Sequence, residues 1–596
     1  EPLLPLRCWR QMNDLPTGPV LWSLAQQEAF IGQVFKLKYN GVYLCLWPQH
    51  PFLDLTVRGI RKQTGTLLFG QRIPIGPDNI GREHLPDRPF LDHPDLAAAG
   101  TYDEKLAAGR RLIEGILVKA RFFGMHTSIH LQPLEFPREF APLLEKPTGG
   151  IQLGGLTCAE TGDLTRPEHL DLVEAQLDAF LDQWGQVDEL SMSMPEHPHA
   201  ESQFRACWEE LDRRCGLEEV APLEELLAAA QRNYLIPGGL ERAGREFRSA
   251  ISMLHFFHRF FEERRVLERA AARGVRLGLT LGGNSEALFP ILERVLWPGA
   301  AIATSLGYTA SRAVRAMDCM ERLDAAKVPA SLVLTLQDDN VGSLPQAATG
   351  SLHLLAENLK RLGWRGFLSR HWPVGDLDPP AAYLARTAWE ATTPERVYED
   401  HLTRVYGVEA APALSQALRL EEDATVVLDL DFLSLFFPVL GILLRSLEAE
   451  QPMAEGLFHV RAMYEQARRL LERAAPTVTT ETGRAELAYW RSRLDFAVGA
   501  LVEKEWIHEG GVRVHAARRA SGEEDRERLM AEAGACYDRA LAAGEAALRA
   551  MAAQVRDDSD RSSLAAYYHF FVREVREKAA GILGGAEGVH AQKEPM

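Results

Sequence analysis

The stretch VDELSMSMPEH, residues 187–197, gives the clearest sign of the fold. It is a short apolar run that ends abruptly in a carboxylate, Glu196. An apolar run of this length, bounded by a polar loop, indicates a buried β-strand. A second stretch, SLVLTLQDDN at 331–340, has the same form and ends in Asp338 and Asp339. Two buried strands that each carry acids at the C-terminal end predict a shared acidic site.

Short apolar runs alternate with amphipathic stretches from the start of the chain to about residue 390, which is typical of β/α units with parallel strands. Eight strands are predicted, at 6–11, 41–47, 126–131, 189–194, 275–281, 301–306, 331–336 and 365–370. Helices are predicted between them, including 26–37, 105–123, 170–184 and 286–296. Eight such units predict a (β/α)8 barrel. A doubly wound open sheet is the alternative, although no strand is followed by a GxGxxG turn.

The sequence changes character at residue 393, where strand patterns end and long helices rich in Ala, Leu, Arg and Glu begin. Helices are predicted at 456–474, 482–504, 525–556 and 562–580. We therefore predict an α/β protein with a catalytic TIM barrel at 1–392, followed by an all-helical C-terminal domain at 393–596. A homodimer formed through the helical domain is a further expectation.

Composition narrows the class of protein. A chain of 596 residues with 46% hydrophobic residues can bury more than one core. The net charge of −17 argues against nucleic acid or an anionic membrane as partner. The seven cysteines form no CxxC pair, which indicates free thiols in a reducing compartment. The longest apolar run, 426–444, contains Asp429, Asp431 and Pro438, so no membrane span is predicted.

A cytoplasmic location is expected. The chain opens almost directly on a strand, and we expect a segment upstream of it. The longest insertions follow the second strand (48–104) and the fourth strand (195–247). Loops after strand C-termini build the active-site face of a barrel, so these insertions are expected of an enzyme. The alternative is that they only cover the barrel or form an interface between protomers.

Glu196 is the first candidate for catalysis, because it leaves the fourth strand on the catalytic face. Its neighbours Met192, Met194 and Pro195 are apolar, and such surroundings raise the pKa of a carboxyl group and suit a general acid. Asp338 and Asp339 are the candidates for base or nucleophile. Adjacent residues on a strand point in opposite directions, so we expect one of these two to face the pocket. Asp339 lies closer to the rim and is favoured.

Other polar and aromatic residues follow the remaining predicted strands and complete the expected binding site. Asn13 and Asp14 leave the first strand and are predicted to contact sugar hydroxyls. Trp47 and Trp372 are suited to stacking on a pyranose ring. The further candidates for substrate contacts are Glu135, Tyr308, Arg370 and His371.

Metal chemistry is the competing interpretation. His197 and His199 form an HPH pair beside Glu196, and His126 and His130 lie on the third strand. A barrel metallohydrolase typically carries a His-x-His motif at the end of its first strand, and this first strand has no histidine. His255 and His258 lie in an aromatic helix and are predicted to be structural. We therefore expect no metal and no cofactor.

The chain resembles the α-glucuronidase and β-hexosaminidase group of barrel glycosidases. The opening CWRQMNDLPTGP (8–19) is similar to the first strand and loop of α-glucuronidases. The region from HWPVGD (371–376) through AAYLARTAWEATTPERVYED (381–400) resembles their passage from barrel to helical domain. The resemblance implies that Glu196 stands where the family places its general acid. The fourth strand ends MPE without the Asp-Glu pair of hexosaminidases, so an N-acetylhexosamine substrate is not implied.

The residues and the resemblance together predict a glycoside hydrolase that uses a pair of carboxylates on a carbohydrate substrate, with glucuronides or related oligosaccharides as the first substrates to consider. Two alternatives remain open. One is a non-catalytic carbohydrate-binding protein that kept the barrel, and the other is a metal-dependent barrel hydrolase.

Overall fold

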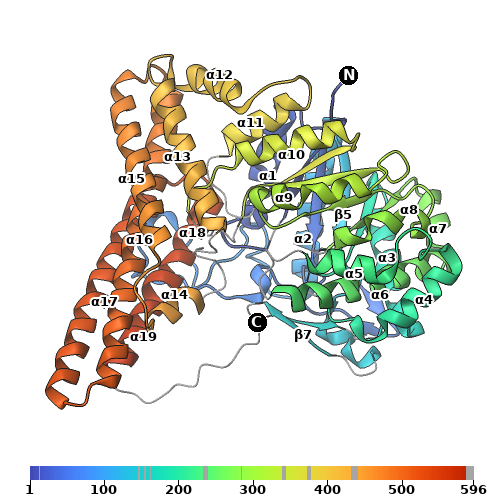
Figure 1. Ribbon diagram of the computed structural model, residues 1–596, viewed down its shortest axis with the longest axis horizontal. Helices are drawn as coiled ribbons and strands as arrows, with labels where there is room; N and C mark the ends of the chain where they lie inside the picture. Colours follow the sequence, from blue (N-terminus) through green and yellow to red (C-terminus); the bar gives the residue numbers. More distant parts are fainter. Residues whose placement is uncertain are drawn as a thin grey trace.

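Eight parallel strands close into a barrel (Figure 1). The computed structural model describes residues 1–12, 14–144, 148–153, 156–160, 163–196, 198–232, 239–282, 285–338, 344–371, 377–430 and 441–584. The barrel strands are β1 (Leu6–Gln11), β2 (Gly41–Leu46), β5 (His126–Leu131), β9 (Glu189–Ser193), β10 (Arg276–Thr280), β11 (Ile302–Thr304), β12 (Ala330–Gln337) and β13 (Gly366–His371). The predicted fold is confirmed, and each of these strands falls at a predicted position.

Closure excludes the open-sheet alternative. The first strand, β1, pairs in parallel with β2 on one side and with the last strand, β13, on the other. The register of the closing pair runs from Leu6 opposite Gly366 to Trp9 opposite Ser369. Because all eight strands run in the same direction, their C-terminal ends meet at one mouth. The side chains that leave β9 and β12 therefore share that mouth.

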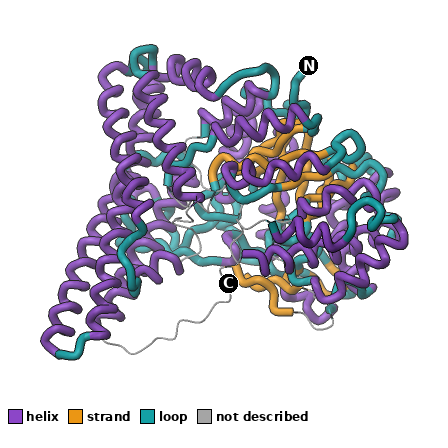
Figure 2. The backbone as a smooth tube through the Cα atoms, viewed as in Figure 1, coloured by secondary structure: helices purple, strands orange, loops and turns teal. Residues whose placement is uncertain are grey.

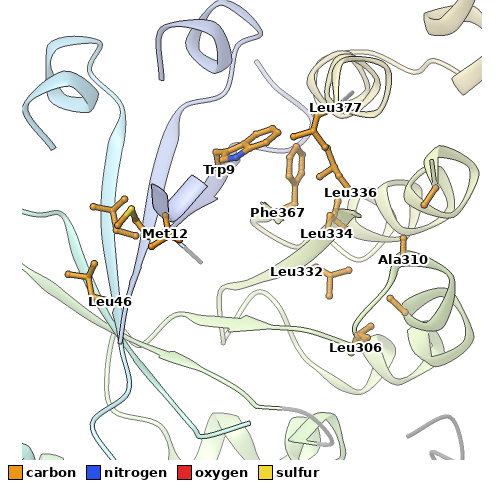
Figure 3. Close-up of a cluster of buried hydrophobic side chains, with 14 of the residues drawn as sticks. Trp9, Met12, Leu46, Leu306, Ala310, Leu332, Leu334, Leu336, Phe367 and Leu377 are labelled. Atoms are coloured by element: carbon orange, nitrogen blue, oxygen red, sulfur yellow. The ribbon is translucent and has the colours of Figure 1, made fainter. Parts of the chain in front are cut away.

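Alternation along the strands sorts side chains between the barrel interior and the surrounding helices. Inside the barrel lies a small apolar cluster of Leu6, Cys8, Tyr43, Cys45, Ala303, Val333 and Leu368. The outward-facing residues, among them Trp9, Leu334 and Phe367, belong to the larger core between the strands and the helices (Figure 3). This division decides which polar residues on the strands can reach a substrate.

Helices follow the strands in the usual order and cover the outside of the barrel. They include α1 (Leu24–Lys36), α2 (Tyr102–Phe122), α3 (Pro167–Trp184), α6 (Gly239–Glu263), α9 (Ala310–Ala316), α10 (Thr349–Arg361) and α11 (Asp378–Thr387). The helix predicted at 286–296 is instead a 3-10 segment, η6 (Ser285–Ile291), followed by the short α8 (Leu292–Val295). Pro290 lies inside this segment, and its missing N–H disfavours a continuous α-helix.

Three excursions interrupt the regular units. The segment after β2 carries β3 (Thr56–Val57), β4 (Ile60–Arg61), η2 (Leu68–Gly70) and η3 (Arg82–His84). The segment after β5 forms a small antiparallel sheet of β6 (Phe136–Pro137), β8 (Leu156–Glu160) and β7 (Thr148–Leu153). The segment after β9 adds η5 (Glu201–Gln203), α4 (Phe204–Cys215) and α5 (Leu223–Gln231), and α7 (Val266–Ala272) follows α6. All three begin at strand C-termini and thus at the mouth.

A helical region follows the barrel and stands beside it (Figures 1 and 2). Its elements are α12 (Pro394–Tyr406), α13 (Ala411–Leu430), α14 (Gly441–Ser446), α15 (Glu455–Ala474), α16 (Glu481–Arg519), α17 (Glu523–Ala552), α18 (Asp558–Tyr567), η9 (Tyr568–Arg573) and α19 (Glu574–Leu583). The predicted boundary at 392/393 falls between α11 and α12. In the described part of the chain, no helix is both long enough and apolar enough to cross a membrane.

The longest helix, α16, continues past the predicted end at Lys504 to Arg519 through two adjacent glycines. A Cβ on Gly510 would lie 2.3 Å from the ring of Tyr537, and one on Gly511 would lie 2.6 Å from the backbone of Ala449. Both glycines are therefore sites of close packing inside the helix rather than helix ends, which explains why the sequence pattern underestimated its length.

Candidate functional site

The interior of the barrel becomes polar toward the C-terminal ends of the strands. At the opposite end of the barrel, where the strands begin, Glu189 forms ion pairs with Arg276 and Arg365, each at 3.6 Å. Further up, the hydroxyl of Tyr43 lies 2.6 Å from that of Thr280. Above this level the charged side chains of the mouth begin, so the mouth presents polar groups above a packed barrel interior.

Arg370 binds groups from neighbouring segments on one side of the mouth. It faces inward from β13, and its Nη2 lies 2.8 Å from Oδ2 of Asp338, the residue that directly follows β12. Its Nε donates a hydrogen bond to Oγ1 of Thr335 at 3.1 Å, and Nη2 also donates to the carbonyl oxygen of Tyr308. Asp338 is only 1% exposed. A buried carboxylate in such a pair is held ionised and in one orientation.

The main chain of Asp338 is fixed as well. Its N–H donates to Oε1 of Gln346 and its carbonyl oxygen accepts from Nε2 of the same side chain, both at 2.8 Å. Gln346 therefore closes a ring of two hydrogen bonds around the end of β12. The position of this acid is determined by the segment that leads into α10.

Glu196 lies across the mouth, just after β9, and its side chain is exposed. The hydroxyl of Tyr308 donates a hydrogen bond to it, and the guanidinium groups of Arg10 and Arg242 are its charged neighbours. Burial and the negative charge of Glu196 raise the pKa of Tyr308 well above its usual value, so this hydroxyl stays a donor. Met192, Met194 and Pro195 are buried, whereas Glu196 is exposed. The raised pKa expected for Glu196 from these apolar neighbours stays a prediction.

Tyr308 links the two candidate acids. Its side chain contacts Glu196, while its carbonyl oxygen accepts from Arg370, which in turn holds Asp338. The residue lies between β11 and α9, next to Thr309, the N-cap of α9. Acids that follow two separate strands are thereby joined through Tyr308 and Arg370.

Three charged residues of the mouth were missed by the sequence analysis. Arg10 faces inward on β1, and its Nε donates to Sγ of Cys45 at 2.7 Å. Arg242 and Glu246 come from the first turns of α6 and form an ion pair of 2.6 Å. The alternation Leu6, Cys8, Arg10 could have identified the first of these. No local pattern distinguishes the other two, because α6 reaches the mouth through tertiary packing.

Asp14 is part of the structure beneath the site. Its two carboxylate oxygens accept from the side chains of His50 and Gln49, at 3.1 and 3.2 Å, and from the backbone N–H groups of Leu68 and Phe69, at 2.7 and 2.8 Å. The side chain is completely buried. Its contacts tie the excursion after β2 to the end of β1, and it offers no surface to a sugar.

Trp47 and Glu135 lie near the C-terminal ends of β2 and β5. Trp47 is half-buried, and its ring meets that of Phe69 edge to face, with centroids 5.8 Å apart. The residue Phe69 has φ 51°, and the neighbouring Leu68 has φ 58°, so two successive non-glycine residues adopt the left-handed conformation. Asp14 binds both of their N–H groups, which connects this strained turn to the aromatic pair. Glu135 is 8% exposed.

The prediction that His371 belongs to the binding site is wrong. The side chain follows Arg370 on β13 and therefore points to the opposite side of the sheet. It is buried among the rings of Trp9, Trp22 and Phe30, with centroids 5.4, 6.5 and 6.1 Å away. Burial lowers the pKa of His371 to about 3. This imidazole packs between the barrel and its helices as a neutral ring.

We expect replacement of His371 by Phe to make the protein less sensitive to acid. The pKa of His371 in the folded protein lies below its ordinary value of 6.5, so the unfolded chain takes up the proton first. Stability is therefore lost as the pH falls from about 6.5, by about 1.4 kcal/mol per pH unit for this one group. Melting temperatures at pH 7 and pH 5 should diverge less in His371→Phe than in the parent. An equal loss in both proteins would contradict a buried neutral imidazole.

Four of the residues predicted to contact substrate, to act in catalysis or considered for a metal site lie outside the described residues. They are Asn13, His197, Asp339 and Trp372. The predicted roles of Asn13 and Trp372 in substrate contact, and of Asp339 in catalysis, stay predictions.

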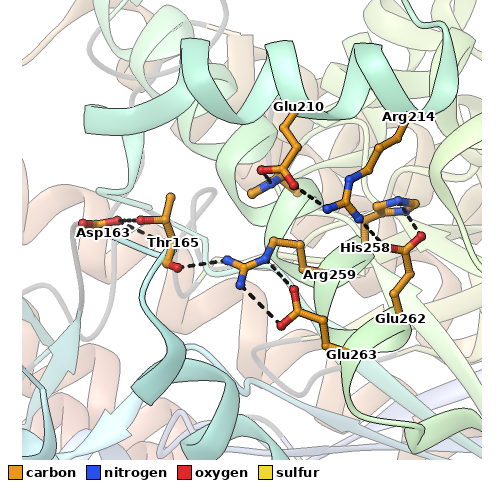
Figure 4. A network of polar contacts seen from close by, with 9 residues as sticks. Asp163, Thr165, Glu210, Arg214, His258, Arg259, Glu262 and Glu263 are labelled. Atoms are coloured by element: carbon orange, nitrogen blue, oxygen red, sulfur yellow. Dashed lines mark hydrogen bonds and ion pairs between the residues drawn. The ribbon is translucent and has the colours of Figure 1, made fainter.

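The histidines considered for a metal site contact protein groups where the structure describes them. Nε2 of His255 lies 2.9 Å from Glu210, and His258 lies 3.2 Å from Glu262, within a network of polar contacts between α4 and α6 (Figure 4). Nδ1 of His130 lies 3.3 Å from the hydroxyl of Tyr43. Among the described residues, no three His, Cys, Asp or Glu side chains are grouped closely enough to hold a metal ion.

No protein-family model and no curated protein matches this sequence. Solved structures do match the fold at low similarity. One is a GH138 enzyme targeting pectin rhamnogalacturonan II, with 10% identity, a TM-score of 0.48, and coverage of 98% of this chain and 83% of that chain. Another is a GH115 4-O-methyl-α-glucuronidase with specificity for decorated arabinogalactans, with 10% identity, a TM-score of 0.30, and coverage of 92% and 78%.

A third is a noncanonic maltogenic α-amylase from Thermotoga neapolitana, with 9% identity, a TM-score of 0.33, and coverage of 65% of this chain and 77% of that chain. These structural neighbours are glycoside hydrolases. Likeness at this level carries no statement about residues or substrate. Any assignment of function must therefore rest on the side chains at the mouth.

Proposed function

We propose that this protein is a glycoside hydrolase whose catalytic carboxylates are Glu196 and one of Asp338 and Asp339. The observation that carries the proposal is the meeting of Glu196 and Asp338 at one mouth of a closed barrel, joined through Tyr308 and Arg370. Cleavage of a glycosidic bond needs one carboxyl group to protonate the leaving oxygen and another to act as base or nucleophile. Two acids that follow different strands can take these two roles, one on each side of the glycosidic bond.

The surroundings of Glu196 favour its ionised form, because Tyr308 donates to it and Arg10 and Arg242 are nearby cations. An ionised carboxylate is what a base or nucleophile requires. We therefore assign this role to Glu196 in place of the general-acid role expected from the sequence. Asp338 is held ionised by Arg370, so proton donation falls to Asp339, on the strength of its position in the sequence.

Glucuronides are the substrates that we propose first. Arg10 lies near Glu196, and its one hydrogen bond to the described residues uses Nε, which donates to Cys45. The outer nitrogens of a guanidinium group form the planar fork that recognises a carboxylate. A uronic acid would present such a carboxylate beside the acid that reacts. Replacement of Arg10 by Met should then reduce kcat/KM for a glucuronide more than for the matching glucoside.

A panel of 4-nitrophenyl glycosides and glucuronides tests the proposal, with release of nitrophenol as the readout. We expect turnover of at least one member of the panel, and loss of that turnover in Glu196→Gln. The matched control is Glu83→Gln, which removes an exposed carboxylate on the excursion after β2 and should behave like the parent.

Two other outcomes of these experiments would favour one of the alternative functions. Sugar binding by calorimetry with no turnover of any glycoside would favour a non-catalytic carbohydrate-binding barrel. Turnover that is lost on dialysis against a chelator and restored by a divalent metal would favour a metal-dependent hydrolase. Either result would overturn the proposal of a carboxylate pair acting alone.

A further inference from the structure

One face of α13 contacts the barrel at two segments, the start of α9 next to Tyr308 and the segment between β12 and α10 that includes Gln346. Glu422, Thr425 and Asp429 follow one another at spacings of three and four residues, so they share a face of the helix. Asp429 is completely buried, and Thr425 is 5% exposed. In Figure 1, α13 belongs to the helical region and stands beside α9 of the barrel.

The first segment begins α9, directly after Tyr308. Oδ1 of Asp429 lies 2.8 Å from Nε of Arg312, and its Oδ2 accepts hydrogen bonds from the hydroxyls of Thr309 and Ser311. The carbonyl oxygen of Asp429 accepts from Nη2 of Arg312 at 3.1 Å. Thr309 is also the N-cap of α9, through its bond from the N–H of Arg312. The turn that presents Tyr308 is thereby fixed from the helical region.

The second segment leads from β12 into α10. Oγ1 of Thr425 accepts from the N–H of Ala347 at 3.1 Å, and Oε1 of Glu422 accepts from the N–H of Gly350 at 2.5 Å. Ala347 directly follows Gln346, whose side chain makes both hydrogen bonds to the main chain of Asp338. The same helix face therefore holds the segment whose Gln346 fixes the main chain of Asp338, and with it the end of β12.

We infer that α13 is a positioning element of the active site, and that Asp429 and Thr425 hold the acids of β9 and β12 at their working separation through Tyr308 and Gln346. The inference deepens the proposed glycosidase function and rests on it. In glycosidases, carboxyl groups about 5–5.5 Å apart give retention and about 6.5–9.5 Å apart give inversion, so a shift of either acid disturbs catalysis directly. The helical region then contributes to the reaction without touching the substrate.

The test compares Asp429→Asn with a control that breaks another buried ion pair of the helical region. Asp560 on α18 lies 2.5 Å from Nη2 of Arg493 on α16, and their side chains are 4% and 10% exposed. Asp560→Asn should lose thermal stability as Asp429→Asn does. We expect only Asp429→Asn to lower kcat, by about 100-fold, because misplacement of a reacting group by about 1 Å costs that much.

Asp429→Asn should also move the limb of the pH–rate profile that reports Glu196 to higher pH, since a displaced Tyr308 no longer donates to the ionised carboxylate. Tyr308→Phe should give the same shift, and the double variant should add nothing to it. Equal kinetic losses in Asp429→Asn and Asp560→Asn, or an unmoved pH profile, would overturn the inference. If Asp429→Asn does not fold, Thr425→Val replaces it, with an expected fall in kcat of about tenfold.

Crystal structures of the parent and the two variants give a readout that does not need turnover. Displacement of the Tyr308 hydroxyl in Asp429→Asn, with no displacement in Asp560→Asn, supports the inference. Unchanged coordinates of Tyr308 and Asp338 overturn it. A parent protein that is inactive on every glycoside would count against the proposed function alone, because the structural comparison still tests the positioning role of α13.

Discussion

Replacing Glu196 by Gln is expected to lower kcat by about 10³-fold or more on any glycoside that the parent cleaves. The substitution keeps the shape of the side chain and removes its charge. Because Glu196 is exposed, the melting temperature should change little. KM should stay within a few-fold of the parent value, since the lost interaction belongs to the transition state. Steady-state kinetics on the best aryl substrate provide the measurement.

The leaving group separates the two roles that a carboxylate can have. A general acid matters little when the leaving phenol is already acidic, as in dinitrophenyl glycosides, whereas a base or nucleophile is needed for every leaving group. We expect Glu196→Gln to be as impaired on dinitrophenyl as on nitrophenyl substrates. Retained activity on the dinitrophenyl substrate alone would return Glu196 to the general-acid role that the sequence predicted.

The barrel was predictable because its signals are local. An apolar strand such as 331–336 and the helix that follows it can be recognised within a short window, and eight repeats leave few topologies. The placement of Glu196 and Asp338 at a common mouth follows from the direction of parallel strands alone. The predicted ends of the strands were also close to the observed ends. For example, β12 begins at Ala330, one residue before its predicted start.

The surroundings of the acids were not predictable in the same way. His371 was assigned to the mouth with Arg370, although alternation on β13 sends adjacent side chains to opposite faces. Asp429 entered the sequence analysis only as a charge that interrupts an apolar run, yet it is bonded to Thr309, which lies 120 positions away in the chain. Contacts between residues so far apart depend on the packing of complete helices, and no window of sequence records them.

Replacing Arg370 by Met is expected to destabilise the folded protein by about 3–5 kcal/mol, because it leaves the carboxylate of Asp338 buried without its cation. The carbonyl oxygen of Tyr308 also loses a donor. Urea unfolding followed by tryptophan fluorescence measures the change. The control is Arg361→Met, which breaks an exposed pair with Glu321 of similar length, 2.7 Å, and should cost about 0–1 kcal/mol.

A double variant assigns the cause of that loss. If the loss of the Arg370 guanidinium from beside the buried carboxylate of Asp338 is responsible, Asp338→Asn in the Arg370→Met background should recover part of the stability, since a neutral amide is less costly to bury than an ion. Activity should not recover, because the linkage of Tyr308 to the end of β12 is still missing. Additive losses from the two substitutions would show instead that Arg370 and Asp338 act independently. In that case the ion pair could not be what holds the acid of β12 in place opposite Glu196.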